Sequence, residues 1–352
     1  MLQIAVIPGD GIGPEVMAQA IPFLEWAQAR GRSLAWTVFP CGAERFLATG
    51  CALSEEEFVR LRDDHDALLF GAVGDPRIPD GRHAEEILLR LRRDLRLHVN
   101  HRPCFPLLDR LVPLKGVAAN EIRIDVLREN TEGPYCLQGE TQPGQAMDFS
   151  IHTEAAVEIL LREAFRLAAS RGCRLHLAHK ANVLKHGHGL WMRIFAGLKL
   201  QFPSVEALPI HADALLCALV QDPRPCGVFA ADNFIGDLVS DLLAAFQGGL
   251  GLAASVSFSP QANHRCAALF EPVHGSAPDL VGLDLANPSG MILSAALLFR
   301  RAGWEDEAKA IESAVLAVLE SGLGTRDLGG TLACGQMGQA ILNHLPRYIA
   351  GI

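Results

Sequence analysis

The sequence predicts an α/β fold with a largely parallel sheet, because strand-like and helix-like segments alternate along most of its 352 residues. Residues 3–7 form an apolar run, a glycine-rich turn follows, and a helical pattern extends over residues 14–30. Pro14 suits the first turn of that helix, where its missing N–H leaves no bond unmade. The length exceeds that of most single cores, which indicates two domains or one large α/β unit.

The later elements continue this alternation. Ser54 and Glu57 form a capping box before a second helix, and an apolar stripe predicts a helix over residues 84–95. Thr153 is the expected cap of a long helix that ends near Ser170. The other expected elements are strands near 67–73, 124–127, 175–178 and 228–230, and helices over 289–301, 304–321 and 336–345.

Composition narrows the class of protein. The formal net charge of −9 makes nucleic acid an unexpected partner, because phosphate binding requires a basic surface. The nine cysteines include no C-x-x-C pair, which indicates free thiols in a reducing compartment. No leader-like pattern and no apolar run near the ~18 residues of a membrane span is present. We therefore expect a cytoplasmic protein without a membrane partner.

A pair of acidic residues follows a glycine. Asp237 and Asp241 are four residues apart after Gly236, so both carboxylates project from one face of a helix. Neighbouring carboxylates repel each other unless a cation lies between them, and oxygen ligands suit Mg²⁺ or Mn²⁺. Acids near a helix start also interact favourably with the helix dipole, so this stretch alone leaves both explanations open.

Arginines concentrate in one region of this acidic protein. Such a local positive field fits a small polyanionic substrate, although about half of these residues are expected to be solvated, Arg90 and Arg93 among them. The cluster consists of Arg82, Arg90, Arg92, Arg93, Arg96, Arg102 and Arg110.

The glycine-rich turn over residues 9–13 invites comparison with a dinucleotide-binding fingerprint. The pattern fails because Pro14 stands where G-x-G-x-x-G requires its third glycine. The acid expected about 20 residues on is also missing, since Glu25 lies early and inside the helical pattern. A tight structural turn is the better interpretation.

Seven segments, in their order and spacing, resemble the β-decarboxylating dehydrogenases that act on isopropylmalate, isocitrate, homoisocitrate and tartrate or D-malate. The resemblance extends from residue 4 to beyond 330. The segments are 9–16, Arg92 with Arg102, 128–135, 179–182, Asp213, Asp237 with Asp241, and 271–279.

The resemblance implies an enzyme that oxidises a 2-hydroxy acid, passes hydride to a nicotinamide and releases CO₂ from the neighbouring carbon. Lys180 matches the lysine that takes the hydroxyl proton, and Tyr135 matches the tyrosine that reprotonates the product carbon. Three guanidiniums would bind the substrate carboxylates in a bidentate manner. They belong to Arg92, Arg102 and Arg128.

The resemblance also implies a divalent ion, Mg²⁺ or Mn²⁺, that contacts the substrate hydroxyl and stabilises developing charge. Its ligands would be Asp213, Asp237 and Asp241, with Asp213 also near the substrate.

NAD is the nicotinamide that the resemblance implies. Asp279 lies where NAD-preferring members carry an acid that binds the ribose hydroxyls and repels a 2′-phosphate. Glu85 matches an acid near the nicotinamide ribose, and His274 is expected to shape the nucleotide loop. The complete set of expected cofactor residues is Glu85, His274, Gly275, Ser276, Ala277, Asp279 and Asn287.

The resemblance leaves the substrate open. Leu88 and Leu89 would line an apolar pocket, which favours 3-isopropylmalate or a related 3-alkylmalate and the leucine-biosynthesis type of enzyme. Glu86 would repel the third carboxylate of isocitrate. Against this, the segment 128–133 looks more like the isocitrate, homoisocitrate and tartrate branches, and His179 stands where isopropylmalate enzymes usually have aspartate. Tartrate/D-malate and homoisocitrate therefore remain alternatives. A non-catalytic regulatory homologue is disfavoured because the lysine, the tyrosine and all three aspartates are present.

The fold implied by the resemblance has two α/β domains and a central mixed sheet, and is not a Rossmann dinucleotide fold. The first domain would be discontinuous, with residues 1–98 and 250–352, and would carry the nucleotide loop. The second, residues 99–249, would carry the metal site and the contacts of a homodimer. In such a dimer Lys180 and Asp213 would serve the partner's active site.

Overall fold

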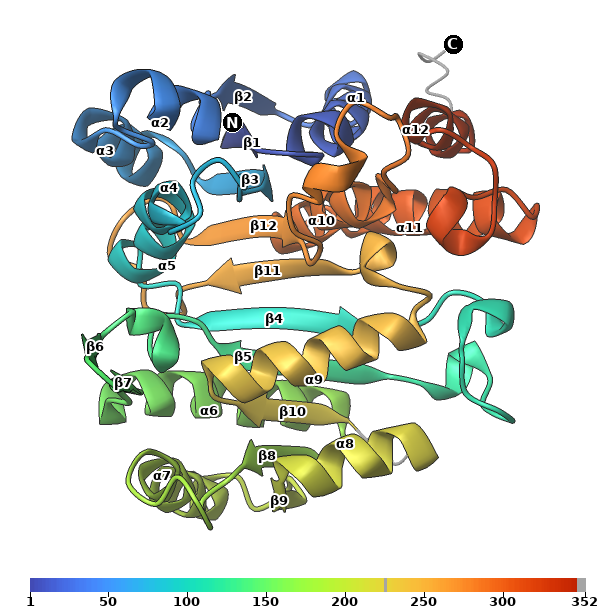
Figure 1. Ribbon diagram of the computed structural model, residues 1–352. Helices are drawn as coiled ribbons and strands as arrows, with labels where there is room; N and C mark the ends of the chain where they lie inside the picture. Colours follow the sequence, from blue (N-terminus) through green and yellow to red (C-terminus); the bar gives the residue numbers. More distant parts are fainter. Residues whose placement is uncertain (225–226, 347–352) are drawn as a thin grey trace. The chain divides into compact units, whose positions relative to one another are not determined.

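The computed structural model describes residues 1–224 and 227–346, and divides into two compact units. Unit 1 consists of Met1–Leu91, Gln247–Val256 and the described part of Ala262–Ile352, whereas unit 2 consists of Arg92–Phe246 and Ser257–Gln261. Figure 1 labels the helices and strands of both units. Each unit is therefore assembled from segments that are separated in the sequence.

Unit 1 contains a parallel sheet in the order β2-β1-β3-β12, and β11 follows β12. All six residues of β3 are buried, as expected for an interior strand. The strands are β1 (Leu2–Gly9), β2 (Leu34–Val38), β3 (Ala67–Ala72), β12 (Ala268–Pro272) and β11 (Ala254–Phe258), whose last two residues are assigned to unit 2. The main helices are α1 (Gly13–Ala29), α2 (Ala43–Thr49), α3 (Glu55–Asp64), α10 (Ser289–Arg301), α11 (Glu305–Glu320) and α12 (Cys334–Asn343).

Unit 2 contains a sheet in the order β4-β5-β10-β8-β9, in which β4 and β5 are antiparallel and the other pairs are parallel. The strands are β4 (Val99–Cys104), β5 (Ile124–Glu129), β8 (Leu175–His179), β9 (Ala207–His211) and β10 (Val228–Ala231). The helices are α6 (Glu154–Arg171), α7 (Gly187–Gln201), α8 (Ala212–Gln221) and α9 (Asn233–Phe246).

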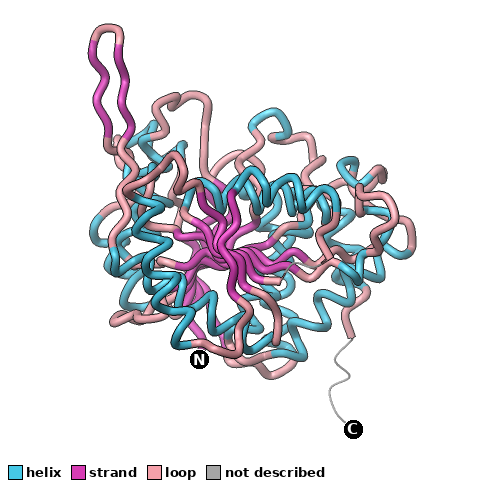
Figure 2. Tube along the Cα trace, turned by 90° about the horizontal axis from the view of Figure 1, so that it is seen from below, coloured by secondary structure: helices cyan, strands magenta, loops and turns pink. Residues whose placement is uncertain are grey.

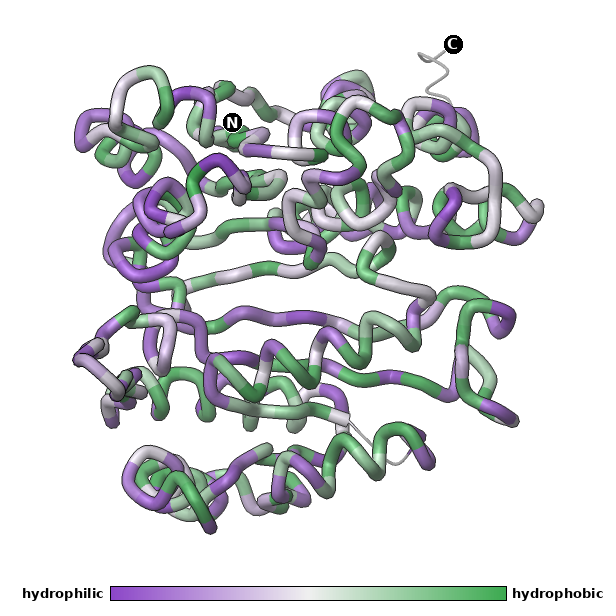
Figure 3. The backbone as a smooth tube through the Cα atoms, in the orientation of Figure 1, coloured by the Kyte–Doolittle hydropathy of each residue, from purple (hydrophilic) through white to green (hydrophobic). Residues whose placement is uncertain are grey.

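Alternating side chains of this sheet build two separate cores. Leu127 packs with α6 and α7, whereas its neighbour Val126 packs with α8 and α9. Successive residues of a strand point to opposite faces, so Arg128 lies on the same face as Val126. Figure 3 shows that β4 is hydrophilic along most of its length, although Asn100 and Arg102 are buried. A polar buried strand requires partners: Ser257 accepts from Asn100, and helix α9 supplies Ser240 and Asp241 to Arg102.

A two-stranded antiparallel hairpin, β6 (Gly139–Gln142) and β7 (Gln145–Asp148), belongs to unit 2. Figure 2 shows it as a projecting arm, and nearly all of its residues are exposed. The sequence analysis did not predict this hairpin, because its strands have little apolar alternation.

The structure confirms the predicted α/β class with a mixed sheet. The Ser54–Glu57 capping box and the Thr153 cap are both present. The helix predicted over 84–95 is different: α4 (Arg82–Ala84) leads into a π-helical turn at Glu85–Leu89 and then into α5 (Arg90–Asp94). Periodicity cannot detect such a turn, because one inserted residue leaves the apolar stripe nearly intact.

Two expectations from composition concern the described residues alone. None of the described helices combines the length and apolarity needed to cross a membrane. The eight described cysteines are free thiols, as predicted, and Cys226 lies outside the described residues.

Candidate active site

Strands β4 and β5 bring two of the predicted arginines onto one face of the sheet. Asn100 and Arg128 are direct partners in this antiparallel pair, and Arg102 lies two residues beyond Asn100. Paired positions and every second residue share a face, so the three side chains point the same way. Arg102 Nε donates a hydrogen bond to Asn100 Oδ1 at 2.8 Å. The asparagine thus fixes the plane of the guanidinium.

Helix α9 presents carboxylates to these guanidiniums. Arg102 forms ion pairs with Asp237 at 3.2 Å and with Asp241 at 3.1 Å, and Arg128 pairs with Asp237. Ser240 Oγ accepts a hydrogen bond from Arg102 Nη1 at 2.9 Å. Both carboxylates therefore lie on the face of α9 that is directed at the arginines.

A glycine allows α9 to approach Arg128 closely. A Cβ on Gly236 would lie 2.8 Å from both the Cβ and the Cγ of Arg128, closer than real Cβ atoms come. Arg128 Nε donates to Asn233 Oδ1 at 2.8 Å, and Asn233 Nδ2 donates to the Glu132 carbonyl at 3.1 Å. The Arg128 side chain is only 2% exposed. Its position is thus set by the helix, the strand and the loop after the strand.

Positive charge exceeds negative charge in this cluster. Burial, together with repulsion from Arg102 and Arg92, lowers the pKa of Arg128 to about 10. Burial raises the pKa of Asp241. Burial acts in the same direction on Asp237, but Arg128 and Arg102 outweigh it and hold the pKa of Asp237 below its ordinary value. Two carboxylates do not neutralise three guanidiniums, so the cluster favours a bound anion.

Tyr135 lies against the same cluster. Its hydroxyl donates a hydrogen bond to Asp237 Oδ2 at 2.8 Å, and the Arg128 guanidinium lies 5.0 Å from its ring centroid. Burial raises the pKa of the phenol above its ordinary value. Tyr135 is therefore a protonated donor at neutral pH. The short helical turn Pro134–Cys136 after the loop holds it there.

Lys180 and Asp213 form a second, more exposed pair within unit 2. Lys180 follows β8 directly, and its Nζ lies 2.6 Å from Oδ1 of Asp213 in the first turn of α8. The ion pair with Lys180 lowers the pKa of Asp213. The side chain of Lys180 is 33% exposed and that of Asp213 is 68% exposed. This pair differs from the arginine cluster in being open to solvent.

Of the three predicted ligand residues, the structure brings Asp237 and Asp241 together but not Asp213, and among the described residues no group of three ligand atoms within 4.8 Å of one another includes any of them. Asp237 and Asp241 lie side by side on α9 and share Arg102 as a counter-ion, while Asp213 is held by Lys180. Carboxylates that need a nearby cation to remain charged are the ligands that a hard divalent ion prefers. The donor chemistry of Asp237 and Asp241 therefore fits Mg²⁺ or Mn²⁺.

The glycine-rich turn of unit 1 is built by contacts within the protein. Gly9 has a φ of 75°, and its α-carbon lies so close to the Ala72 carbonyl that no side chain would fit. Asp10 is buried, and its carboxylate accepts backbone N–H groups from Ala43 at 2.5 Å and Gly74 at 3.0 Å. A carboxylate in this position would repel a pyrophosphate. The turn is structural, in agreement with the sequence analysis.

The same turn holds one end of the expected cofactor loop. The Ile12 N–H donates to the Ser276 carbonyl at 2.9 Å, and Gly11 leaves no space for a Cβ against Ser276. Ala277 adopts a positive φ of 40°, and the exposed Asp279 lies in the short turn Pro278–Leu280. This loop has a defined shape that the rest of unit 1 imposes.

Two polar side chains of this loop and its continuation, His274 and Asn287, are expected to bind the nucleotide, but they differ in whether they are free to do so. His274 Nε2 is buried without a hydrogen-bond partner, and burial lowers the pKa of this imidazole. A neutral ring with an unpaired nitrogen can bind an uncharged polar ligand group. Asn287 is used differently: it donates to Asp327 at 3.0 Å and accepts the Ser289 N–H at 3.0 Å. Its side chain fixes the start of α10.

The π-helical turn carries the residues expected at the alkyl pocket and the ribose. Glu85 is exposed, and Leu88 and Leu89 are half-buried. Glu86 accepts the Ala52 N–H at 2.9 Å, so its carboxylate secures a neighbouring loop. Arg90 was predicted to be solvated, and this prediction is wrong. Its guanidinium pairs with Glu55 and lies 4.5 Å from the ring centroid of Phe58.

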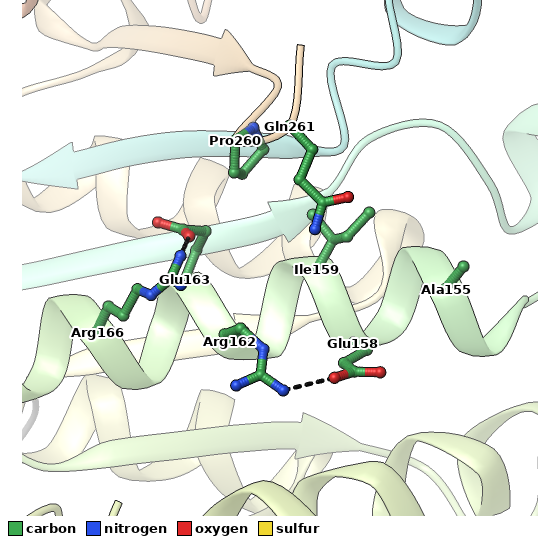
Figure 4. Close-up of a pocket in the computed structure, with 8 residues that line it drawn as sticks. All are labelled: Ala155, Glu158, Ile159, Arg162, Glu163, Arg166, Pro260 and Gln261. Atoms are coloured by element: carbon green, nitrogen blue, oxygen red, sulfur yellow. Dashed lines mark hydrogen bonds and ion pairs between the residues drawn. The ribbon is translucent and has the colours of Figure 1, made fainter. Parts of the chain in front are cut away.

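A groove elsewhere on unit 2 has a volume of about 370 Å³ but none of the residues described above. Figure 4 shows its wall on α6, where Arg162 pairs with Glu158 at 2.5 Å and Arg166 pairs with Glu163. Its charges compensate one another. The groove therefore lacks the unbalanced positive charge that the arginine cluster offers to an anion.

Several residues that shape the site were not singled out from the sequence. Asn100, Asn233 and Ser240 each bind an arginine of the cluster. The sequence offered two signals for them: a polar residue two positions before Arg102, and polar residues on the same helix as the acidic pair. Buried His188, which accepts the Lys180 N–H, and its partner Asp232 gave no recognisable motif.

Comparison with known proteins identifies the family. Residues 3–341 match the family described as isocitrate/isopropylmalate dehydrogenase. The chain belongs to this family. It is 42% identical over 326 residues to a 3-isopropylmalate dehydrogenase of Thermobifida fusca, which covers 91% of each chain. It is also 42% identical over 343 residues to a 3-isopropylmalate dehydrogenase of Streptomyces coelicolor, with 94% of this chain and 97% of the relative covered.

Solved structures agree with the family assignment. The chain is similar to the isocitrate dehydrogenase of Methylococcus capsulatus, with a TM-score of 0.88 and 31% identity over 98% of this chain and 99% of the other. The resemblance drawn from the seven segments is therefore confirmed, as is the two-domain fold of these dehydrogenases. The chain is a dehydrogenase of this family.

Proposed function

We propose that the protein catalyses the NAD-dependent oxidative decarboxylation of 3-isopropylmalate or a closely related 3-alkylmalate. The observation that carries the chemistry is the buried cluster of guanidiniums around Asp237, with Tyr135 hydrogen-bonded to the same carboxylate. The substrate rests on relatives at about 42% identity that carry the name 3-isopropylmalate dehydrogenase. A role in leucine biosynthesis follows from the same names.

The arginines would bind the two carboxylates of the substrate. Arg128 is held by Asn233 and Arg102 by Asn100, so both guanidiniums are oriented before a ligand arrives. Arg92 adds the third charge, which already lowers the pKa of Arg128. An incoming dianion would relieve the repulsion among the three groups. Orientation of this kind brings reacting atoms together without further loss of freedom.

Lys180 and Tyr135 would move the two protons of the reaction. Lys180, once released from Asp213, would take the proton of the 2-hydroxyl group as hydride leaves the same carbon. Tyr135 would give its phenol proton to the carbon that has lost CO₂. The raised pKa of Tyr135 keeps that proton in place until it is needed.

NAD would accept the hydride, and a divalent ion would polarise the hydroxyl oxygen and stabilise negative charge on it. Asp237 and Asp241 would hold the ion together with Asp213. The loop from His274 to Asp279, with Glu85 and Asn287, would hold the dinucleotide. Asp279 is exposed and acidic, which favours ribose hydroxyls over a 2′-phosphate.

Leu88 and Leu89 would contact the alkyl group. The alternative substrates, tartrate or D-malate, rest on the segment 128–133 and are weakened by its contacts. Glu132 accepts the Thr153 N–H at 2.7 Å and the Thr153 hydroxyl at 2.6 Å. Asn130 Nδ2 donates to the Leu97 carbonyl at 3.1 Å. Both side chains that distinguish this segment thus support the backbone.

We also infer a homodimer with shared active sites in the cytoplasm. Phe234 is 52% exposed and Leu238 is 50% exposed, and both lie on α9 beside the carboxylates. Val220 of α8 is exposed as well. An apolar stripe next to a charged site suits a self-complementary interface. Lys180 and Asp213 would then reach the arginine cluster of the partner.

The test is NADH formation in the presence of Mn²⁺ and NAD. 3-Isopropylmalate, D-malate, the two tartrates, homoisocitrate and isocitrate are compared at matched concentrations. We expect the highest kcat/KM for 3-isopropylmalate. A preference for D-malate or tartrate would overturn the substrate assignment, and no turnover of any of the six by the folded dimer would overturn the proposed reaction.

A further inference from the structure

A buried polar cluster lies beneath Lys180 in unit 2. His188, in the first turn of α7, is 1% exposed, and Asp232 precedes α9 and is also buried. His152 lies alongside, with its ring centroid 5.9 Å from that of His188. Two histidines and an aspartate within reach of one another are a possible metal site. The hydrogen bonds decide against it.

The tautomer of His188 follows from its partners. The Lys180 N–H donates to His188 Nδ1 at 2.8 Å, so Nδ1 carries a lone pair. A neutral imidazole then has its proton on Nε2, which donates to Asp232 Oδ2 at 3.0 Å. A metal on Nε2 would require the ring to lose that proton as well. Both nitrogens of His188 are therefore occupied by hydrogen bonds.

His152 is also engaged. Its Nδ1 accepts the Trp191 indole N–H at 3.1 Å, and its Nε2 lies 2.9 Å from Ser150 Oγ. Burial lowers the pKa of this ring, which therefore stays neutral. His152 packs edge-on against the ring of His188. In this cluster each ring nitrogen has a hydrogen-bond partner, and the tautomer of His188 fixes which groups donate and which accept.

Asp232 connects this cluster to helix α9. Its second oxygen, Oδ1, accepts the Ile235 N–H at 2.7 Å and so caps the helix that carries Asp237 and Asp241. At the other end, the Lys180 carbonyl accepts the Val183 N–H at 3.0 Å and the Leu184 N–H at 2.9 Å. The backbone of Lys180 is thus held on both sides, whereas its Nζ is held by an exposed aspartate.

We propose that His188 is a positioning residue for Lys180: with Asp232 it forms a relay that fixes the backbone of Lys180 relative to the start of helix α9. The proposal rests on the proposed function, in which Lys180 is the base. The base has a flexible side chain, so the direction of its Cα–Cβ bond decides where Nζ can reach. Loss of a supporting hydrogen bond of this type typically reduces activity by about 10- to 100-fold.

Two substitutions separate the hydrogen bond from packing. In His188→Asn the side-chain oxygen can replace Nδ1 and accept the Lys180 N–H. In His188→Gln the amide can replace Nε2 and reach Asp232, but Lys180 loses its acceptor. We expect His188→Asn to retain most of kcat, and His188→Gln to lose about 10- to 100-fold in kcat with little change in KM. The unchanged KM reflects the intact arginine cluster.

A third substitution leaves the ring in place. Asp232→Asn can still cap α9 through its oxygen, but its amide group would donate towards Nε2 and favour the opposite tautomer. Nδ1 would then oppose the Lys180 N–H. We expect a kcat loss comparable to that of His188→Gln, because the wrong tautomer can disable a well-placed ring. Thermal unfolding of each variant shows whether the fold is retained.

Hydrogen exchange of the peptide that contains Lys180 tests the relay without turnover. We expect the amide to be protected in the wild type and in His188→Asn, and to exchange at least about tenfold faster in His188→Gln. Equal exchange in all variants, equal kcat in all variants, or stoichiometric zinc that His188→Asn removes would each overturn the proposal. If the wild type turned over no substrate, the proposed function would fail while the exchange data still decided the relay.

Discussion

The arginine cluster and the Lys180–Asp213 pair of unit 2 have the same kinds of charge but opposite surroundings. Arg128 is 2% exposed, and asparagine, aspartate and a tyrosine ring contact it. Asp213 is 68% exposed and is held by Lys180. The cluster is complete within one chain, whereas the pair lies open. In the proposed homodimer, the substrate carboxylates would bind within one subunit, whereas proton abstraction by Lys180 would require the surface of the partner.

The largest expected effect concerns the exposed pair. Lys180→Met should lower kcat by about 10²- to 10⁴-fold, because general base catalysis contributes that much. Stability should change little, since the Lys180 side chain is partly exposed. Steady-state kinetics and thermal unfolding measure both. Lys199→Met, at an exposed position of α7, is the matched control and should leave kcat intact. A loss shared by the control would contradict the assignment.

The buried cluster should respond in both activity and stability. Arg128→Lys keeps the charge but cannot bind Asn233 and Asp237 together, so kcat/KM should fall by about 100-fold. Disturbing a buried ion pair should also destabilise the fold by roughly 3 kcal/mol. Arg93→Lys, on a 61% exposed side chain, is the control. Equal effects of the two substitutions would show that burial of Arg128 is unimportant.

Two glycine substitutions test the close packing at the arginine cluster by their effect on stability alone. Gly236→Ala would place a methyl group 2.8 Å from Arg128, so we expect a loss of about 1–3 kcal/mol. Gly189→Ala in α7 meets nothing within 4 Å and should stabilise the helix by about 0.5–1 kcal/mol. Urea unfolding of both variants gives the two free energies. If both substitutions changed the free energy of unfolding in the same direction, α9 would not be closely packed on Arg128.

The smallest effect concerns Asp241. Burial raises the pKa of Asp241 in the folded state above its value in the unfolded state. The folded protein therefore loses stability as the pH rises from the unfolded-state pKa through the folded-state pKa. At neutral pH without divalent ions, Asp241→Asn should therefore be more stable, by less than about 1 kcal/mol because the group is half exposed. Mn²⁺ should stabilise the wild type more than the variant. Thermal unfolding of the wild type and of Asp241→Asn, each with and without Mn²⁺, measures this difference. An equal rise of Tm in the two proteins would contradict the prediction.

The sequence analysis predicted the elements that periodicity and capping specify. Helix α10 has the predicted bounds, and Thr153 caps α6. Three of the features that it did not predict have a physical explanation. The π-turn at Glu85–Leu89 preserves the apolar stripe, and the exposed β6–β7 hairpin lacks one. The sequence of β4 is polar although the strand is buried, because Asn100 and Arg102 bind each other, Ser257 and helix α9.

The site shows a similar division. The family resemblance predicts charged site residues, because the chemistry of the reaction restricts their type and spacing. The residues that orient them come from elsewhere in the chain: Asn100 and Arg128 are paired by strand register, and Asn233 reaches Arg128 across more than a hundred positions. His188 and Lys180 are close in sequence, yet only the turn between β8 and α7 brings ring and amide together. Such contacts are properties of the fold.

The most direct test of the difference between the two regions is subunit complementation. Lys180→Met and Arg128→Met are each expected to be inactive as homodimers. Differently tagged copies of the two variants, refolded together, would form mixed dimers with one intact site. We predict that the mixture recovers about a quarter of the wild-type activity, since half of the dimers are mixed and one of their two sites is complete. Mixed dimers that form without any recovery would contradict a shared site and place Lys180 beside the arginines of its own chain.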